Sequence, residues 1–101
     1  MKLEIRKETG HVYNGDNIMF SSAYLSRIKS CLIHLSKNGE RVEAIVKDGY
    51  LSITNYGSGE SRAFHHTSVN SQNELNHHSI DELNKIFEFL LKACKDQLKL
   101  P

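Results

Sequence analysis

Two pairs of adjacent histidines give the sequence its clearest potential for metal chemistry. His65-His66 and His77-His78 stand at the ends of a polar segment over residues 66–78. Imidazole nitrogens bind zinc, nickel and copper, so closure of this segment would bring the two pairs together around one ion. The Cys-x-x-Cys and His-Glu-x-x-His spacings of established zinc sites are absent from the sequence. We therefore favour a polar loop over 66–78, keep the metal site as an alternative, and expect no cofactor.

A thiol and an imidazole three residues apart are the next candidates for chemistry. Cys31 falls near the edge of the apolar stripe of a predicted helix, whereas His34 falls on its solvent side. A nucleophilic cysteine needs a neighbouring group that lowers the pKa of its thiol, and the nearby sequence offers none. The glycines within residues 56–62 lack the Gly-Lys-Ser/Thr start of a phosphate-binding helix. The sequence therefore predicts that Cys31 is a packing residue and that the protein is not an enzyme.

A three-stranded meander is the best-defined element that could position these residues. Asp48-Gly49 separates two alternating segments, 40–47 and 50–56, which predicts a two-residue type I′ hairpin that pairs Lys47 with Tyr50. Residues 61–65 are predicted to add a third strand. This register places a set of apolar residues on one face of the hairpin, namely Val42, Ala44, Val46, Leu51 and Ile53.

Two amphipathic helices flank the meander. Ser21 or Ser22 can cap a helix that extends to about residue 36, and Ser79 with Glu82 forms a capping box for a helix that extends to about residue 98. A short strand over residues 2–7 and a hairpin around Asn14-Gly15 precede them. We expect an α+β fold, in which an antiparallel sheet, made of the N-terminal hairpin plus the three-stranded meander, is covered on one face by two helices. The second helical stripe is Ile80, Leu83, Ile86, Phe87, Leu90, Leu91, Cys94 and Leu98.

Size and charge restrict the classes of function. The chain has 101 residues and 39% hydrophobic residues, which predicts a single domain over 1–101 with one modest core. Lys and Arg number 13 against 12 Asp and Glu, so the chain lacks the basic excess of many nucleic-acid-binding proteins. Neither a membrane-spanning segment nor a signal-like apolar stretch is present. We expect a cytoplasmic protein whose two cysteines, Cys31 and Cys94, are free thiols.

Nucleic-acid binding is the second alternative function. One helix, three antiparallel strands and a second helix follow one another over residues 23–98, an order that resembles double-stranded-RNA-binding domains. The resemblance implies phosphate contacts at the start of the last helix, where this chain has Ser79, Asp81 and Glu82 instead of lysines. Acidic residues there would repel phosphate, so we consider this function less favoured. The remaining basic cluster, near the first helix, is Arg27, Lys29, Lys37 and Arg41.

Five candidate interface residues, all apolar or aromatic, lie outside the predicted core. Ile45 and Tyr50 fall on the outer face of the meander hairpin, Ile33 and Phe89 fall outside their helical stripes, and Tyr56 lies next to a turn. Exposed strands and aromatic-bearing faces are common sites of protein association. The sequence therefore favours a non-catalytic protein of the inhibitor, immunity, adaptor or accessory type. Its partner would be another protein or a second copy of the chain.

Overall fold

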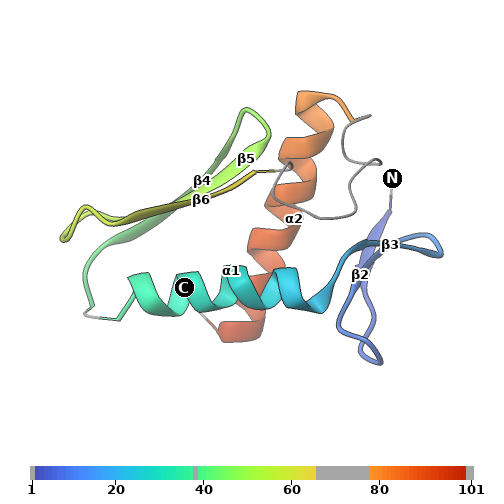
Figure 1. The fold of residues 1–101 in the computed structure, drawn as a ribbon, viewed down its shortest axis with the longest axis horizontal. Helices are drawn as coiled ribbons and strands as arrows, with labels where there is room; N and C mark the ends of the chain where they lie inside the picture. The colour runs from blue at the N-terminus through green and yellow to red at the C-terminus, as the bar shows by residue number, and fades with distance from the viewer. Residues whose placement is uncertain (1, 38, 66–77, 100–101) are drawn as a thin grey trace.

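The computed structural model describes residues 2–37, 39–65 and 78–99 and shows an α+β fold with two antiparallel three-stranded sheets and two helices (Figure 1). The expected α+β class is therefore confirmed, but the expectation of one sheet is wrong, because the N-terminal strands and the meander form separate sheets. The polar segment 66–78 lies outside the described residues except for His78. In chain order, the elements are β1 (Leu3–Ile5), β2 (Val12–Asn14), β3 (Asn17–Phe20), α1 (Ser22–Leu35), β4 (Val42–Lys47), β5 (Tyr50–Asn55), β6 (Ser61–His65) and α2 (Ile80–Leu98).

The meander β4–β5–β6 has the predicted register. Lys47 pairs with Tyr50, Val46 with Leu51 and Ala44 with Ile53. Asp48 and Gly49 both have positive φ, 54° and 80°, as a type I′ turn requires. The side chains of Leu51 and Ile53 are fully buried, so the predicted inner face of the meander is confirmed.

Both helices begin at the predicted caps and pack on that inner face. The Ser21 hydroxyl accepts the N–H of Tyr24, and Ser79 and Glu82 form the reciprocal capping box. The helix α1 packs against β5 and β6, whereas α2 packs against β4 and β5 and also contacts α1. The two helices cross beneath the meander, which leaves its opposite face uncovered by any described element (Figure 1).

The N-terminal strands form a sheet of their own. Asn14 pairs with Asn17 across the predicted turn, and β1 adds a third strand that pairs with β2. Only Ser21 separates β3 from α1, and none of the described N-terminal strands pairs with the meander. Met19 and Phe20 nevertheless enter the same core cluster as residues of α1, α2 and the meander. The two sheets therefore share one core.

One residue of the predicted helical stripes lies outside the core. Ile80 is 50% exposed although its helical position matches the apolar stripe of α2. It is the first residue of the helix and lies by the Asp48-Gly49 turn, where its side chain is close to Gly49. The turn covers only one side of this side chain. Leu83, one turn further along α2, is buried as predicted.

Candidate functional site

The uncovered side of the meander is the first candidate surface, which we call the outer face. Because side chains alternate along a strand, the ladders place Ile45, Ser52 and Ala63 side by side across its centre. The side chain of Ile45 is 46% exposed, and Ser52 and Ala63 are too small to cover it. This central row has no charge. The complete outer face comprises Glu43, Ile45, Lys47, Tyr50, Ser52, Thr54, Ser61, Ala63 and His65.

Aromatic residues stand at both ends of the outer face. At one end the Tyr50 ring stacks on the His65 ring, with 6.2 Å between centroids and 29° between planes. At the other end the Arg41 guanidinium lies over the Tyr56 ring, 5.0 Å from its centroid, and donates to Glu43 Oε2 at 2.8 Å. These contacts hold two aromatic side chains in fixed positions around the central row. Aromatic residues and arginine are enriched at protein interfaces.

The five predicted interface residues do not form one surface. Ile45, Tyr50 and Tyr56 do lie along the outer face and its end. Ile33 is 56% exposed but lies on α1, which is on the other side of the meander. Phe89, the remaining predicted interface residue, lies on α2 and away from the outer face. It packs partly against the core and lines a surface pocket with Leu3, Glu82 and Lys85, because the whole of α2 lies beneath the sheet.

The four predicted nucleic-acid residues are also dispersed. Lys29 Nζ donates to Gln97 of α2 at 3.0 Å, which directs this side chain toward the second helix. Arg41 is bound to Glu43 on the outer face, and Lys37 is exposed beyond the end of α1. Arg27 instead lines a pocket between α1 and β6. The structure therefore does not gather these cations into one phosphate-binding surface.

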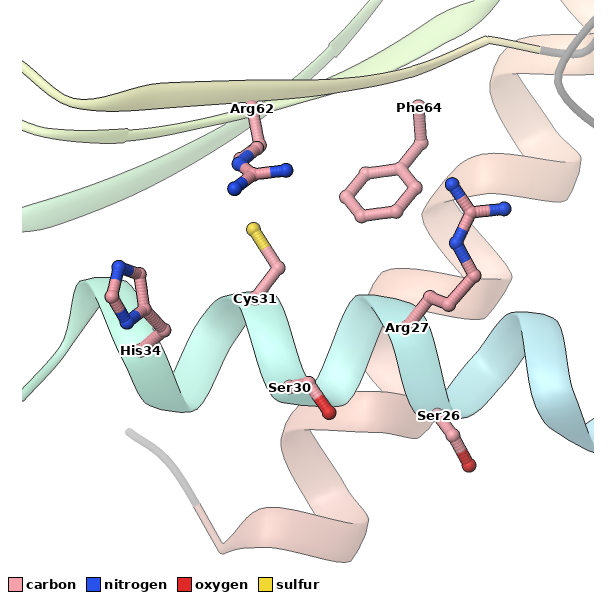
Figure 2. A pocket seen from close by; sticks show the side chains of 7 residues that line it. All are labelled: Ser26, Arg27, Ser30, Cys31, His34, Arg62 and Phe64. Carbon is pink, nitrogen blue, oxygen red and sulfur yellow. The ribbon is translucent and has the colours of Figure 1, made fainter.

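The pocket between α1 and β6 is the second candidate site (Figure 2). It encloses about 410 Å³, and Arg27 and Arg62 enter it from the helix and from the strand, with the Phe64 ring between them. Within the described residues, neither guanidinium forms an ion pair with an acidic side chain. This arrangement could hold an anionic group. The pocket is lined by Ser26, Arg27, Ser30, Cys31, His34, Arg62 and Phe64.

Cys31 of this pocket is not an activated nucleophile. Burial raises the pKa of its thiol, and the nearby Arg62 guanidinium lowers this pKa but only in part, while Glu60 raises it. His34 Nε2 lies 3.1 Å from Glu60 Oε2, and no hydrogen bond between His34 and Cys31 is found among the described residues. A thiol with a raised pKa is protonated at neutral pH and is a poor nucleophile.

We expect Cys31 to react slowly with iodoacetamide. In a Cys94→Ser background at pH 7.5, its rate should be lower than that of free glutathione, because the raised thiol pKa leaves less thiolate. The pH dependence of the rate should show a midpoint above the ordinary cysteine pKa. His34→Ala should leave the rate unchanged. A rate faster than that of glutathione, or one that depends on His34, would show that Cys31 is activated.

The histidine pairs are only partly covered by the described residues. His65 stacks on Tyr50, and His78 Nδ1 lies 3.3 Å from Glu82 Oε2 at the start of α2. His66 and His77 lie outside the described residues. Among the residues that the structure describes, no group of three or more histidine, cysteine, aspartate or glutamate side chains could hold a metal ion. The metal site over 66–78 therefore stays a prediction.

Comparisons with protein families, with curated proteins and with solved structures find no match for this chain. In the described part of the chain, neither helix combines the length and apolar character needed to cross a bilayer.

Proposed function

We propose that this chain is a non-catalytic protein-binding module whose binding surface is the outer face of the meander. The observation that carries this proposal is the position of the two helices. Both pack on the inner face, so the uncharged row of Ile45, Ser52 and Ala63 is left without a described cover. An inhibitor, immunity protein, adaptor or accessory factor would use such a surface. Cys31 and Cys94 are both free thiols, which supports a reducing compartment, and we place the protein in the cytoplasm.

The chemistry of the outer face defines the kind of partner. Its centre is uncharged and exposes Ile45, so it fits a partner surface with an aliphatic or aromatic anchor. Its charged residues are Lys47 and Glu43, and the Glu43 carboxylate already binds Arg41, which leaves Lys47 as its cation without a described acidic partner. This cation fits an acidic residue beside the anchor of the partner.

Site-specific crosslinking tests this proposal. A photoreactive residue at Ser52 should give a discrete adduct with one cellular protein, because Ser52 lies in the central row beside Ile45. The same residue at Ile33 is the matched control, since Ile33 is exposed on α1. Tyr50→Ala and Ile45→Ala should each reduce the adduct by about tenfold if these side chains are interface anchors.

The stability of both variants provides the second control. Tyr50 and Ile45 lie outside the core cluster, so each alanine variant should keep a free energy of unfolding within about 1 kcal/mol of the original chain. A Ser52 adduct that persists at full yield in both variants contradicts the proposal. Adducts of equal yield from Ser52 and Ile33 also contradict it, because they would report random collisions.

A further inference from the structure

Among the described strands, β4 and β6 are the two edges of the meander without a partner strand, and only β6 carries an inward-pointing charge. Strand β6 carries Arg62 on its inner side, and an inward-pointing charge is a common device against edge-to-edge pairing. Strand β4 has no such device. Its inward residues are Val42, Ala44 and Val46, it contains no proline or glycine, and its pairing with β5 has no bulge. A regular edge of this kind is a template for another strand.

The hydrogen-bonding pattern shows which groups this edge offers. The N–H of Tyr56 donates to the carbonyl of Arg41 at 2.9 Å, in the same register as the pair of Lys47 and Tyr50. Because hydrogen-bonded residues alternate along an antiparallel strand, the odd-numbered residues of β4 bond to β5. Val42, Ala44 and Val46 therefore direct their backbone groups outward. No hydrogen bond to these groups is found within the described residues.

A groove lies beneath the same edge. It encloses about 240 Å³ between β4, the end of α1 and the side of α2, and its walls include Leu32, Val42 and Lys95. The inward side chains of β4 are only half-buried, although Leu51 on the neighbouring strand is fully buried. The apolar layer is thus incomplete at this edge, where a further apolar side chain would fit.

We propose that a second copy of this chain pairs with this edge, β4 against β4 in antiparallel orientation, with the two-fold axis at Ile45. Ala44 then exchanges hydrogen bonds with Val46 of the second copy, since both residues direct their backbone groups outward. The side chain of that Val46 lies beside Ala44, over the groove. The two meanders become one six-stranded sheet, and the outer face continues across both copies.

Charge complementarity selects this register. With the axis at Ile45, Glu43 stands opposite Lys47 of the second copy, and symmetry repeats this pair. Moving the axis to Ala44 sets Glu43 opposite Ile45 and brings Lys47 opposite Arg41, which repel. Moving it to Val46 leaves Glu43 opposite Gly49. Of these registers, only the one at Ile45 places an opposite charge across from Glu43 and Lys47 of both copies, and Glu43 then lies between Arg41 of its own chain and Lys47 of the second copy. This inference concerns the edge, and it does not depend on whether the outer face binds another protein.

Exchanging the charges tests the register. Light scattering and sedimentation equilibrium up to about 1 mM protein should detect a reversible dimer. Glu43→Lys and Lys47→Glu should each weaken it by about tenfold or more, because like charges then face each other twice. The double variant should restore dimerisation, and an equimolar mixture of the two single variants should form heterodimers. Tyr50→Ala should leave the dimer unchanged, because Tyr50 lies on the central strand β5, which separates this experiment from the test of the outer face.

Disulfide trapping tests the position of the axis. Directly opposed residues outside the hydrogen-bonded pairs have Cα atoms about 4.5 Å apart, a separation that a disulfide spans. In a Cys31→Ser background, Ile45→Cys should therefore form a covalent dimer under mild oxidation, whereas Ile33→Cys, equally accessible on α1, should not. A chain that stays monomeric at about 1 mM, or a dimer that the charge variants leave unchanged, overturns the proposal. Equal trapping from positions 45 and 33 also overturns it.

Discussion

Replacing Phe20 with alanine is expected to lower the free energy of unfolding by about 4 kcal/mol. The side chain of Phe20 is only 1% exposed, and its ring stacks on Tyr24, with 5.1 Å between centroids, and lies 6.3 Å from the ring of Phe87. It comes from the N-terminal sheet, whereas its neighbours come from α1 and α2. Its removal leaves a cavity at the junction of three elements, and the fixed backbones around it can only partly close that cavity.

Urea unfolding followed by far-ultraviolet circular dichroism and by tyrosine fluorescence measures this loss. Ile18→Ala on the same strand is the matched control, because Ile18 is 52% exposed and its loss should change stability by less than about 0.5 kcal/mol. Both probes should report one transition, since the two sheets share one core. A Phe20→Ala loss below about 1 kcal/mol would contradict the shared core. So would separate transitions for the two sheets in the original chain.

The meander could be predicted residue by residue because two independent signals agree there. The Asp48-Gly49 pair specifies the turn, and the alternation of apolar residues specifies which side chains face inward. A shift of one residue would expose Leu51 and Ile53, so the pattern tolerates only one register. The capping box of Ser79 and Glu82 is likewise a local signal, and the helix begins where it predicts.

The separation of the two sheets could not be predicted from local signals. Residues 3–5 and 12–20 show strand patterns, but their partners are decided by the path of the chain after Phe20. Helical periodicity predicts only the direction in which a side chain points around the helix axis. It therefore places Ile80 in the core, although the side chain is half exposed. Whether the first turn of α2 is covered depends on where the tip of the β4–β5 hairpin ends.

The candidate sites also differ in whether local sequence signals could predict them. Ile45 and Tyr50 were placed on the outer face from the strand register alone, and the structure confirms that placement. Phe89 was grouped with them because the sequence does not say on which side of the sheet its helix exposes it. The pocket residue Arg62 was missed, although a signal was present. Its register places it beside Ile53 on the apolar face, and an inward-pointing charge on an edge strand is a recognisable departure from the apolar pattern.

Asn55→Ala is expected to destabilise the protein by about 3 kcal/mol, because it removes three hydrogen bonds and leaves a buried carbonyl without a partner. Asn55 is the one buried polar residue among those described, with 5% exposure. Its Nδ2 donates to the carbonyl of Leu35 at 2.7 Å, where α1 ends. Its Oδ1 accepts the N–H of Gly57 at 2.8 Å and the N–H of Ser58 at 3.0 Å. One side chain therefore ties the end of the first helix to the turn between β5 and β6.

Thermal and urea unfolding should show this loss, with Thr54→Ala as the neighbouring control. The hydroxyl groups of Thr54 and Ser61 share one hydrogen bond on the exposed outer face. Replacing Thr54 should therefore lower the free energy of unfolding by less than about 1 kcal/mol. The amides of Gly57 and Ser58 should also exchange hydrogen faster in Asn55→Ala, because they lose their acceptor. Asn55→Asp keeps that acceptor but cannot donate to Leu35 when ionised, so it should protect these amides and still lose stability. If Asn55→Ala and Thr54→Ala lower the free energy of unfolding by the same amount, Asn55 does not join the helix to the meander.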